Sequence, residues 1–339
     1  MNNQNAKQDI QKLLSCFSEV FSRPSFKIFS SFVIGFIQLG KETHTSSMVQ
    51  SLSFSFLHRS LSSFTRFLGQ NVWALEKVAE TALEQFFHTL QIKAHSVLFL
   101  IVDDTICQKS GKKIPGCAWH RDHAQKAYVF GHQWVLFALL YKDFFLPLWG
   151  KLYHPKATKG CGPFQTKITM AKKMLQTFRL PIPCKVYLLA DSWYWAKELA
   201  QLCRKYGYHM ISQLKTSSVV FMNGEKTKLT TLSNINSAYR EVSVFVYGKN
   251  KTLKIARFVG IIQGLGKALR KNALLSFNSI PKDRKYLFWF RSVNLNFCSA
   301  LSFEKIILFF FQHSKLIRIP LSPLSPYPPI KRFSTSAID

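Results

Sequence analysis

Acidic residues are scarce in this chain of 339 residues, which has 17 Asp and Glu against 46 Lys and Arg and a formal net charge of +29. So large an excess of positive charge favours a polyanionic partner such as DNA or RNA, because binding then releases counterions. No basic amphipathic helix stands out, which makes a membrane surface the less favoured partner. No run of 18 or more uncharged apolar residues occurs, so we expect no transmembrane helix.

Other absences limit the class of protein further. The seven cysteines form no C-x-x-C pair and are odd in number, which favours reduced thiols over a disulfide framework. Residues 1–7 have no apolar segment behind them, which predicts no signal peptide and a cytoplasmic location. Glycine is absent after Gly266, and the sequence then becomes rich in Phe, Ser and Leu and ends in a Pro-rich stretch. We expect residues 275–339 to form an atypical, poorly ordered tail.

The remaining sequence divides into two parts. Residues 1–95 have a helical pattern, clearest over 73–90, with Asn71 as the expected N-cap. Strand-like and helix-like patterns alternate over residues 96–274. We expect strands at 97–102, 133–141, 144–153, 185–190 and 209–214, helices at 167–179 and 193–206, and two short strands within 242–258. This order predicts an α/β fold with a mixed sheet flanked by helices, preceded by an all-helical domain.

Two of the predicted strands end in aspartate. Asp103 and Asp104 follow the apolar segment 97–102, and Asp191 follows the segment 185–190. A carboxylate at the end of a buried strand is a rigidly held oxygen ligand of the kind that Mg²⁺ takes. The alternative is that these residues cap the next helix or turn. The basic loop at 109–113 follows the first pair and could hold the phosphates on which a metal ion acts.

Several motifs together resemble the bacterial insertion-sequence transposases of the DDE superfamily. They are D-D-T at 103–105, the basic loop, H-x-D-H-A at 120–124, Gly-His at 131–132 and A-D-S-W-Y at 190–194. The resemblance covers roughly residues 20–270. It implies a helical DNA-binding domain over 1–95 and a ribonuclease-H-like catalytic core over 96–274. It also implies cleavage and strand transfer of DNA at insertion-sequence ends, on two Mg²⁺ ions for which Mn²⁺ can substitute, by a protein that dimerises on DNA.

The resemblance also implies roles for individual acids. Asp103 corresponds to the first metal ligand, with Asp104 as the alternative, and Asp191 to the second. The third ligand of the family is a Glu in a Y-x2-R-x3-E-x6-K helix, which this sequence lacks. Tyr239-Arg240-Glu241 has the letters without the spacing, and Glu304 lies in about the right region without the basic partners. The change in composition near residue 275 indicates that a frameshift or truncation replaced this segment, which predicts little or no strand transfer.

The other candidate residues are basic or aromatic. We expect DNA contacts from Arg59, Arg66, Lys109, Lys112, Lys113, His120, Arg121, His123, His132 and Trp193. On the predicted helix, Lys167, Lys172, Lys173 and Arg179 either follow phosphates or simply face solvent. A zinc site from Cys117, His120, His123 and His132 is less favoured, because its spacing is tight and a second thiolate is missing. Two other functions stay open: a non-catalytic DNA-binding derivative that inhibits transposition, and a metal-dependent nuclease of the same fold.

Overall fold

The computed structural model describes two compact units. The described residues are 3–39, 45–52, 59–71, 73–111, 113–122, 125–156, 158, 161–214, 218–222, 224–228, 240–246, 249–255, 257–262, 273–278 and 287–292. The first unit comprises Met1–Ser96, Phe144–Trp149 and Arg179–Cys184. The second comprises Val97–Asp143, Gly150–Phe178 and Lys185–Asp339.

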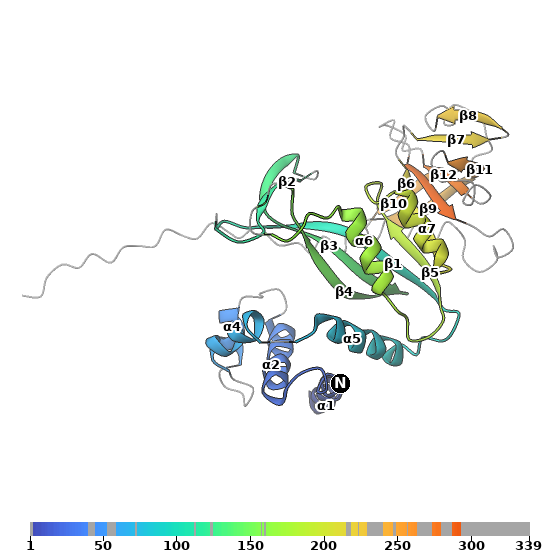
Figure 1. The fold of residues 1–339 in the computed structure, drawn as a ribbon. Coiled ribbons are helices and arrows are strands. Elements are labelled where there is room, and N and C mark those ends of the chain that lie inside the picture. The colour runs from blue at the N-terminus through green and yellow to red at the C-terminus, as the bar shows by residue number, and fades with distance from the viewer. Residues whose placement is uncertain are drawn as a thin grey trace, which may run out of the picture. The chain divides into compact units, whose positions relative to one another are not determined.

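The first unit is mainly helical. Its helices are α1 (Asn3–Ser15), α2 (Arg23–Leu39), α3 (Thr45–Ser51), α4 (Leu61–Gly69) and α5 (Leu75–Thr89) (Figure 1). Aromatic rings make its core: Phe21 stacks on Phe29 with ring centroids 4.6 Å apart, and Phe67 stacks on Trp73 at 5.5 Å. Because residues 144–149 of a strand belong to the same unit, it is not built from helices alone.

The start of α5 differs from the expectation. Its N-cap is Ala74, which makes no side-chain capping bond, and the predicted cap at Asn71 was wrong. The Asn71 amide instead donates a hydrogen bond to the Ser25 hydroxyl, 3.1 Å away at the start of α2. The Asn71 side chain therefore makes a tertiary contact and does not mark the start of α5.

The second unit is built on a mixed sheet. Its leading strands are β1 (Val97–Gln108), β2 (Ala118–Asp122), β3 (Ala127–Tyr141), β5 (Lys185–Ala190) and β6 (His209–Leu214), together with the part of β4 (Phe144–Tyr153) from Gly150 onward. In space they run β2-β3-β1-β5-β6, and β4 also pairs with β3. The β1–β3 pair is antiparallel, whereas β1–β5 and β5–β6 are parallel. This mixed α/β arrangement is consistent with a ribonuclease-H-like fold.

Helices and further strands complete the second unit. They are α6 (Lys167–Thr177), α7 (Lys197–Lys205), β7 (Val219–Met222), β8 (Glu225–Lys228), β9 (Arg240–Val246), β10 (Lys249–Ile255), β11 (Arg257–Ile262), β12 (Ala273–Asn278) and β13 (Leu287–Ser292) (Figure 1). The ring of Phe178, just after α6, packs edge-on against Phe137 of β3. Strands β9 and β10 form the expected hairpin as a separate two-stranded sheet.

Three expected boundaries need correction. Strand β1 does not end at residue 102 but continues to Gln108, because its second half pairs with β3 as far as Gly131. The helix expected to begin at residue 193 begins at Lys197. Residues 275–278 and 287–292, expected in an irregular tail, are strand residues of the sheet, and the rest of 279–339 lies outside the described residues. No helix in the described ranges is both long and apolar enough to span a membrane.

Candidate active site

The end of the parallel ladder between β1 and β5 brings the three candidate aspartates to one region of the sheet. The parallel ladder between these strands runs from the pair Val97–Lys185 to the pair Val102–Ala190. Neighbouring strands lie about 4.8 Å apart, so the residues that follow the last pair start out side by side, although the β1 residue stays in the sheet, paired with Leu136 of β3, while the other lies beyond the end of β5. Asp103 and Asp191 are those residues, and Asp104 is the next along β1.

Asp104 accepts hydrogen bonds from three side chains. Its Oδ2 accepts hydrogen bonds from Lys167 Nζ at 2.8 Å and from the Gln133 amide at 2.5 Å. Its Oδ1 accepts a bond from the Tyr194 hydroxyl at 3.3 Å. The Lys167 and Asp104 side chains are only 13% and 18% exposed, so this is a largely buried ion pair. A buried carboxylate needs such donors, because burial without them is costly.

Lys167 is held by two aromatic rings as well as by Asp104. Its Nζ lies 5.2 Å from the centre of the Tyr153 ring and 5.5 Å from that of Trp193, within the range of cation–π attraction. Lys167 is the first residue of α6, after the N-cap Thr166, whose hydroxyl accepts a bond from the Thr169 amide. The positive end of the helix dipole disfavours a cation there. The carboxylate and the two rings therefore have to offset that repulsion.

Asp191 shapes the turn after β5. Its Oδ1 accepts the backbone N–H of Trp193 at 2.9 Å and that of Tyr194 at 3.3 Å, which closes a turn ahead of α7. Burial raises the pKa of Asp191 and the negative charge of Asp104 adds to the rise, while the two backbone bonds and Lys167 oppose it. The capping alternative considered from the sequence thus describes one real contact of Asp191. The carboxylate is also electrostatically linked to Asp104.

Tyr194 connects the three carboxylates. Its side chain is fully buried, and its hydroxyl donates to Asp104. Burial raises the pKa of Tyr194, and the negative charges of Asp104, Asp103 and Asp191 raise it further. All three acids therefore act on the same hydroxyl group. Two motifs that lie far apart along the chain, at 103–105 and 190–194, therefore come together around Tyr194.

His120 lies inside the hairpin of β2 and β3. Its side chain is 5% exposed, and its Nε2 has no hydrogen-bond partner among the residues that the structure describes. Burial lowers the pKa of His120, and the positive charge of Lys167 lowers it further. His120 lies on β2 and His132 on β3. A ring as buried as that of His120 is badly placed for direct contact with DNA.

The other predicted DNA contacts are scattered. Arg66 lies on α4 and Arg59 precedes it, both in the first unit. In the second unit, Lys109 and Lys113 follow the end of β1. The Arg121 guanidinium lies 5.9 Å from the centre of the Tyr128 ring. The His132 Nε2 is 2.8 Å from the Pro115 carbonyl oxygen, and the Trp193 side chain is 57% exposed. Three further candidates, Lys112, His123 and Glu304, lie outside the described residues.

No complete metal site is visible in the described part of the chain. Within it, no three His, Cys, Asp or Glu side chains are placed to hold a metal ion, and His123 of the zinc interpretation lies outside it. The carboxylates near Tyr194 have the right chemistry for a hard divalent cation, which takes oxygen ligands. Asp191 and the two acids of β1 could supply part of a ligand set. Glu241, the other sequence candidate, is the second residue of β9.

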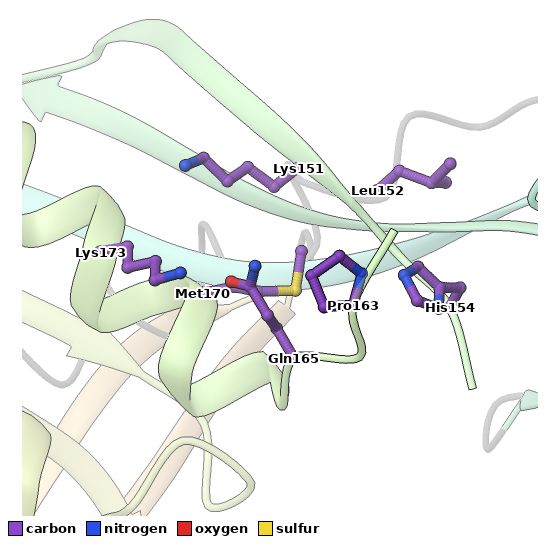
Figure 2. Close-up of a pocket in the computed structure, with 7 residues that line it drawn as sticks. All are labelled: Lys151, Leu152, His154, Pro163, Gln165, Met170 and Lys173. Carbon is purple, nitrogen blue, oxygen red and sulfur yellow. The ribbon is translucent and has the colours of Figure 1, made fainter. Parts of the chain in front are cut away.

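A small basic pocket lies between β4 and α6. It has a volume of about 200 Å³ and is lined by Lys151, Leu152, His154, Pro163, Gln165, Met170 and Lys173 (Figure 2). Lys151 and His154 come from β4 and the residue after it, and Lys173 from α6 (Figure 2). Two lysines and a histidine around one hollow are suited to a phosphate group.

Sequence reasoning did not single out Gln133 or the ion pair formed by Lys167. One signal for Gln133 was available: it is a polar residue at an inward position of a strand that is otherwise apolar, and it is almost fully buried. Tyr194 was considered only as a stacking or core residue. No local pattern pairs Lys167 with Asp104, because 63 residues separate them.

A mixed sheet with clustered carboxylates where parallel strands end defines a class of nucleic-acid-processing enzymes with a ribonuclease-H-like core. Residues 17–231 match the family model described as DDE superfamily endonuclease. Because the match covers more than half of the 339 residues, the chain belongs to this family. The resemblance read from the motifs is thereby confirmed at the level of the superfamily. No curated protein sequence matches the chain. Members of this superfamily act on DNA and generally use divalent metal ions.

Proposed function

We propose that this protein is an insertion-sequence transposase that binds the ends of its element and cleaves and joins DNA phosphodiesters. Membership of the DDE superfamily endonucleases supports the chemistry, and the net charge of +29 supports a polyanionic substrate. The helices of the first unit, with Arg59 and Arg66, would contact the DNA ends. On DNA the protein would act as a dimer, because two ends have to be brought together.

One observation carries the catalytic part of the proposal. The parallel ladder between β1 and β5 ends at the pair Val102–Ala190, and the next residues on both strands are acids. Asp104 and Asp191 each raise the pKa of the Tyr194 hydroxyl, and Asp104 also raises that of Asp191. Paired carboxylates that repel one another in a basic protein are costly unless a cation joins them. This supports Asp191 and Asp104, with Asp103 beside them, as the acids of the site.

A divalent cation, Mg²⁺ or Mn²⁺, would be held by Asp191 and by one of the two acids of β1. When bound, such an ion lowers the pKa of a ligated water or hydroxyl and stabilises charge on the phosphate oxygens. A third acid is needed from outside the described residues, and Glu304 is the candidate. These assignments extend the family's general use of divalent metals to particular residues of this chain.

Lys167 has a separate role in the proposal. Its ammonium group balances the charge of Asp104 while the site holds no substrate. The same group lies beside the exposed ring of Trp193, so it can reach a phosphate that approaches from solvent. Lys151 and Lys173 around the small pocket add further positive charge on the same unit. We propose that these three lysines hold the DNA backbone, and that Asp104 orients Lys167.

Nicking of supercoiled plasmid DNA in Mg²⁺ or Mn²⁺ tests the catalytic proposal. The wild-type chain should nick the plasmid, and Asp191→Asn should abolish nicking while leaving DNA binding within twofold. Asp143→Asn is the matched control, because Asp143 is an exposed acid of the same unit outside the cluster. Equal nicking by wild type and Asp191→Asn would refute the assignment.

One observation favours a second function, a non-catalytic DNA-binding derivative that inhibits transposition. Asp104 already has Lys167, Gln133 and Tyr194 as partners, and the described residues complete no metal site. Under this alternative the C-terminal segment would have lost the third acid, and the chain would bind DNA without cutting it. The nicking assay separates the two functions: binding with no cleavage by the wild-type chain, in either metal, assigns the second.

A further inference from the structure

The hairpin of β2 and β3 has one buried face and one exposed aromatic face. In its antiparallel register Trp119 pairs with Phe130, His120 with Val129, and Arg121 with Tyr128. Cross-strand partners share a face and successive residues alternate, so the His120–Val129 pair lies on one side and the other two pairs on the opposite side. His120 and Val129 are 5% and 8% exposed, whereas Trp119 and Tyr128 are 66% and 64% exposed.

The exposed side of the hairpin is an unusual surface. Trp119 and Phe130 have ring centroids 5.5 Å apart, and the guanidinium of Arg121 lies 5.9 Å from the centre of the Tyr128 ring. Apolar residues scattered singly on a surface need no explanation, but several aromatic rings on one short hairpin indicate a binding site. The aromatic side chains on this face are large and flat, and the strands hold them in place. A ligand can therefore stack on them with little loss of side-chain conformational entropy.

A hollow lies against this face. Its volume is about 680 Å³, and it is lined by Gln108, Lys109, Ser110, Trp119, Gln125, Ala127, Tyr128, Val129 and Phe130. That volume is in the range typical of sites for small organic groups. Trp119, Tyr128 and Phe130 supply its apolar surface, and Lys109 supplies positive charge.

The charge around the hollow selects the kind of ligand. Lys109, Arg121 and Lys126 lie on or beside the hairpin, and Asp122 is the acid on its described strands. The Asp122 carboxylate accepts the Gln125 backbone N–H inside the turn. Aromatic rings interleaved with cations bind the two parts of an unpaired nucleotide, because the rings stack on the base and the cations neutralise the phosphate.

We propose that this aromatic face binds unpaired nucleobases of DNA, stacked on Trp119 and Tyr128, with the adjoining phosphates held by Lys109 and Arg121. The inference rests on the proposed function for the identity of the ligand as DNA. A paired base inside a duplex hides both of its ring faces, so the face is specific for bases that have left the stack. Stacking without a fixed set of hydrogen-bond donors is tolerant of sequence.

Binding of a fluorescent twelve-residue oligothymidylate tests the proposal, with a DNA duplex of the same length for comparison. Fluorescence anisotropy is measured in EDTA, so that neither metal nor cleavage affects the result. Trp119→Ala should weaken oligothymidylate binding about tenfold or more, since each stacked base contributes substantially to affinity. Duplex affinity should change less than twofold. Trp119→Phe keeps a ring face and should retain most of the affinity.

Phe144→Ala is the matched control, because Phe144 is an exposed aromatic residue, 54% accessible, outside the hairpin. Unchanged oligothymidylate binding by Trp119→Ala would overturn the proposal. Unchanged binding together with a change in sedimentation coefficient would assign the face to contact with a second copy of the chain. A wild-type chain that binds neither oligothymidylate nor duplex would reject the proposed function itself, whereas loss of the Trp119 effect alone rejects only the hairpin site.

Discussion

Replacing Lys167 by Met should destabilise the second unit by removing one partner of a largely buried ion pair. Lys167 Nζ lies 2.8 Å from Asp104 Oδ2, and the two side chains are 13% and 18% exposed. Met keeps the length of the aliphatic stem and its packing against the rings of Tyr153 and Trp193. The change therefore isolates the loss of the charge.

The magnitude follows from three contributions. Breaking a buried pair costs about 3–5 kcal/mol, and the lower end applies here because Gln133 and Tyr194 still donate to Asp104. Loss of cation–π attraction adds to this cost. Removing a cation from the first residue of α6 relieves its repulsion by the helix dipole and returns about 0.5 kcal/mol. We expect a net loss of about 3 kcal/mol in the free energy of unfolding.

Urea unfolding followed by tryptophan fluorescence measures this loss, and a double-mutant cycle with Asp104→Asn assigns it. The double variant should be less destabilised than the sum of the two single variants, with a coupling energy of about 2 kcal/mol. A loss below about 0.5 kcal/mol for Lys167→Met, the size typical of exposed surface changes, would refute the reasoning. So would strictly additive effects.

Three further predictions concern single residues. Asp191→Asn should keep both backbone bonds to its Oδ1 and should stabilise the protein at pH 7, since burial raises the folded-state pKa of Asp191. This gain should vanish below the unfolded pKa of about 4. Urea midpoints of the variant and the wild type, measured in EDTA across pH 3–7, would contradict the prediction if they differed by the same amount at every pH. The lowered pKa of His120 predicts that acidification from pH 7 to 5 costs stability, and His120→Leu should lessen this dependence in thermal melts; an unchanged pH profile would count against it. A Cβ on Gly131 would lie 2.2 Å from the Cys107 carbonyl oxygen, so Gly131→Ala should lower the free energy of unfolding by about 2 kcal/mol or more. Gly162→Ala, with open space around it, should be near neutral. Equal unfolding midpoints for the two variants would exclude the clash.

Local patterns predicted the central elements of the fold well. The apolar segments 97–102, 185–190 and 209–214 are strands, and the helix expected over 167–179 is α6, which ends at Thr177. Each of these elements carries its own signal, because a buried strand or an amphipathic helix repeats its pattern within a few residues.

What local patterns missed depends on contacts between distant segments. The second half of β1 contains Asp103, Asp104 and Gln108, which do not look like strand residues, and β3 holds them in the sheet. The Asp191 carboxylate closes a turn through the backbone N–H groups of Trp193 and Tyr194, and α7 begins only at Lys197. Asn71 caps no helix because α5 begins only at Leu75, and the Asn71 amide donates to Ser25 instead.

The candidate site was predicted in part. The three aspartates were chosen from their positions at strand ends, and all three act on the pKa of Tyr194. Their assignment as metal ligands stays a prediction. The closest partners of Asp104 could not be found from sequence, because Gln133 and Lys167 lie 29 and 63 residues away from it.

The alternation within the β2–β3 hairpin restricts how its length can change. Since neighbouring residues point to opposite sides, inserting one residue into either strand would turn His120 or Val129 toward water and press a large ring against the interior. Two-residue insertions preserve the orientation of every side chain. Length variants of this hairpin that still fold should therefore differ by even numbers of residues per strand, a parity rule that comparison of natural variants can check.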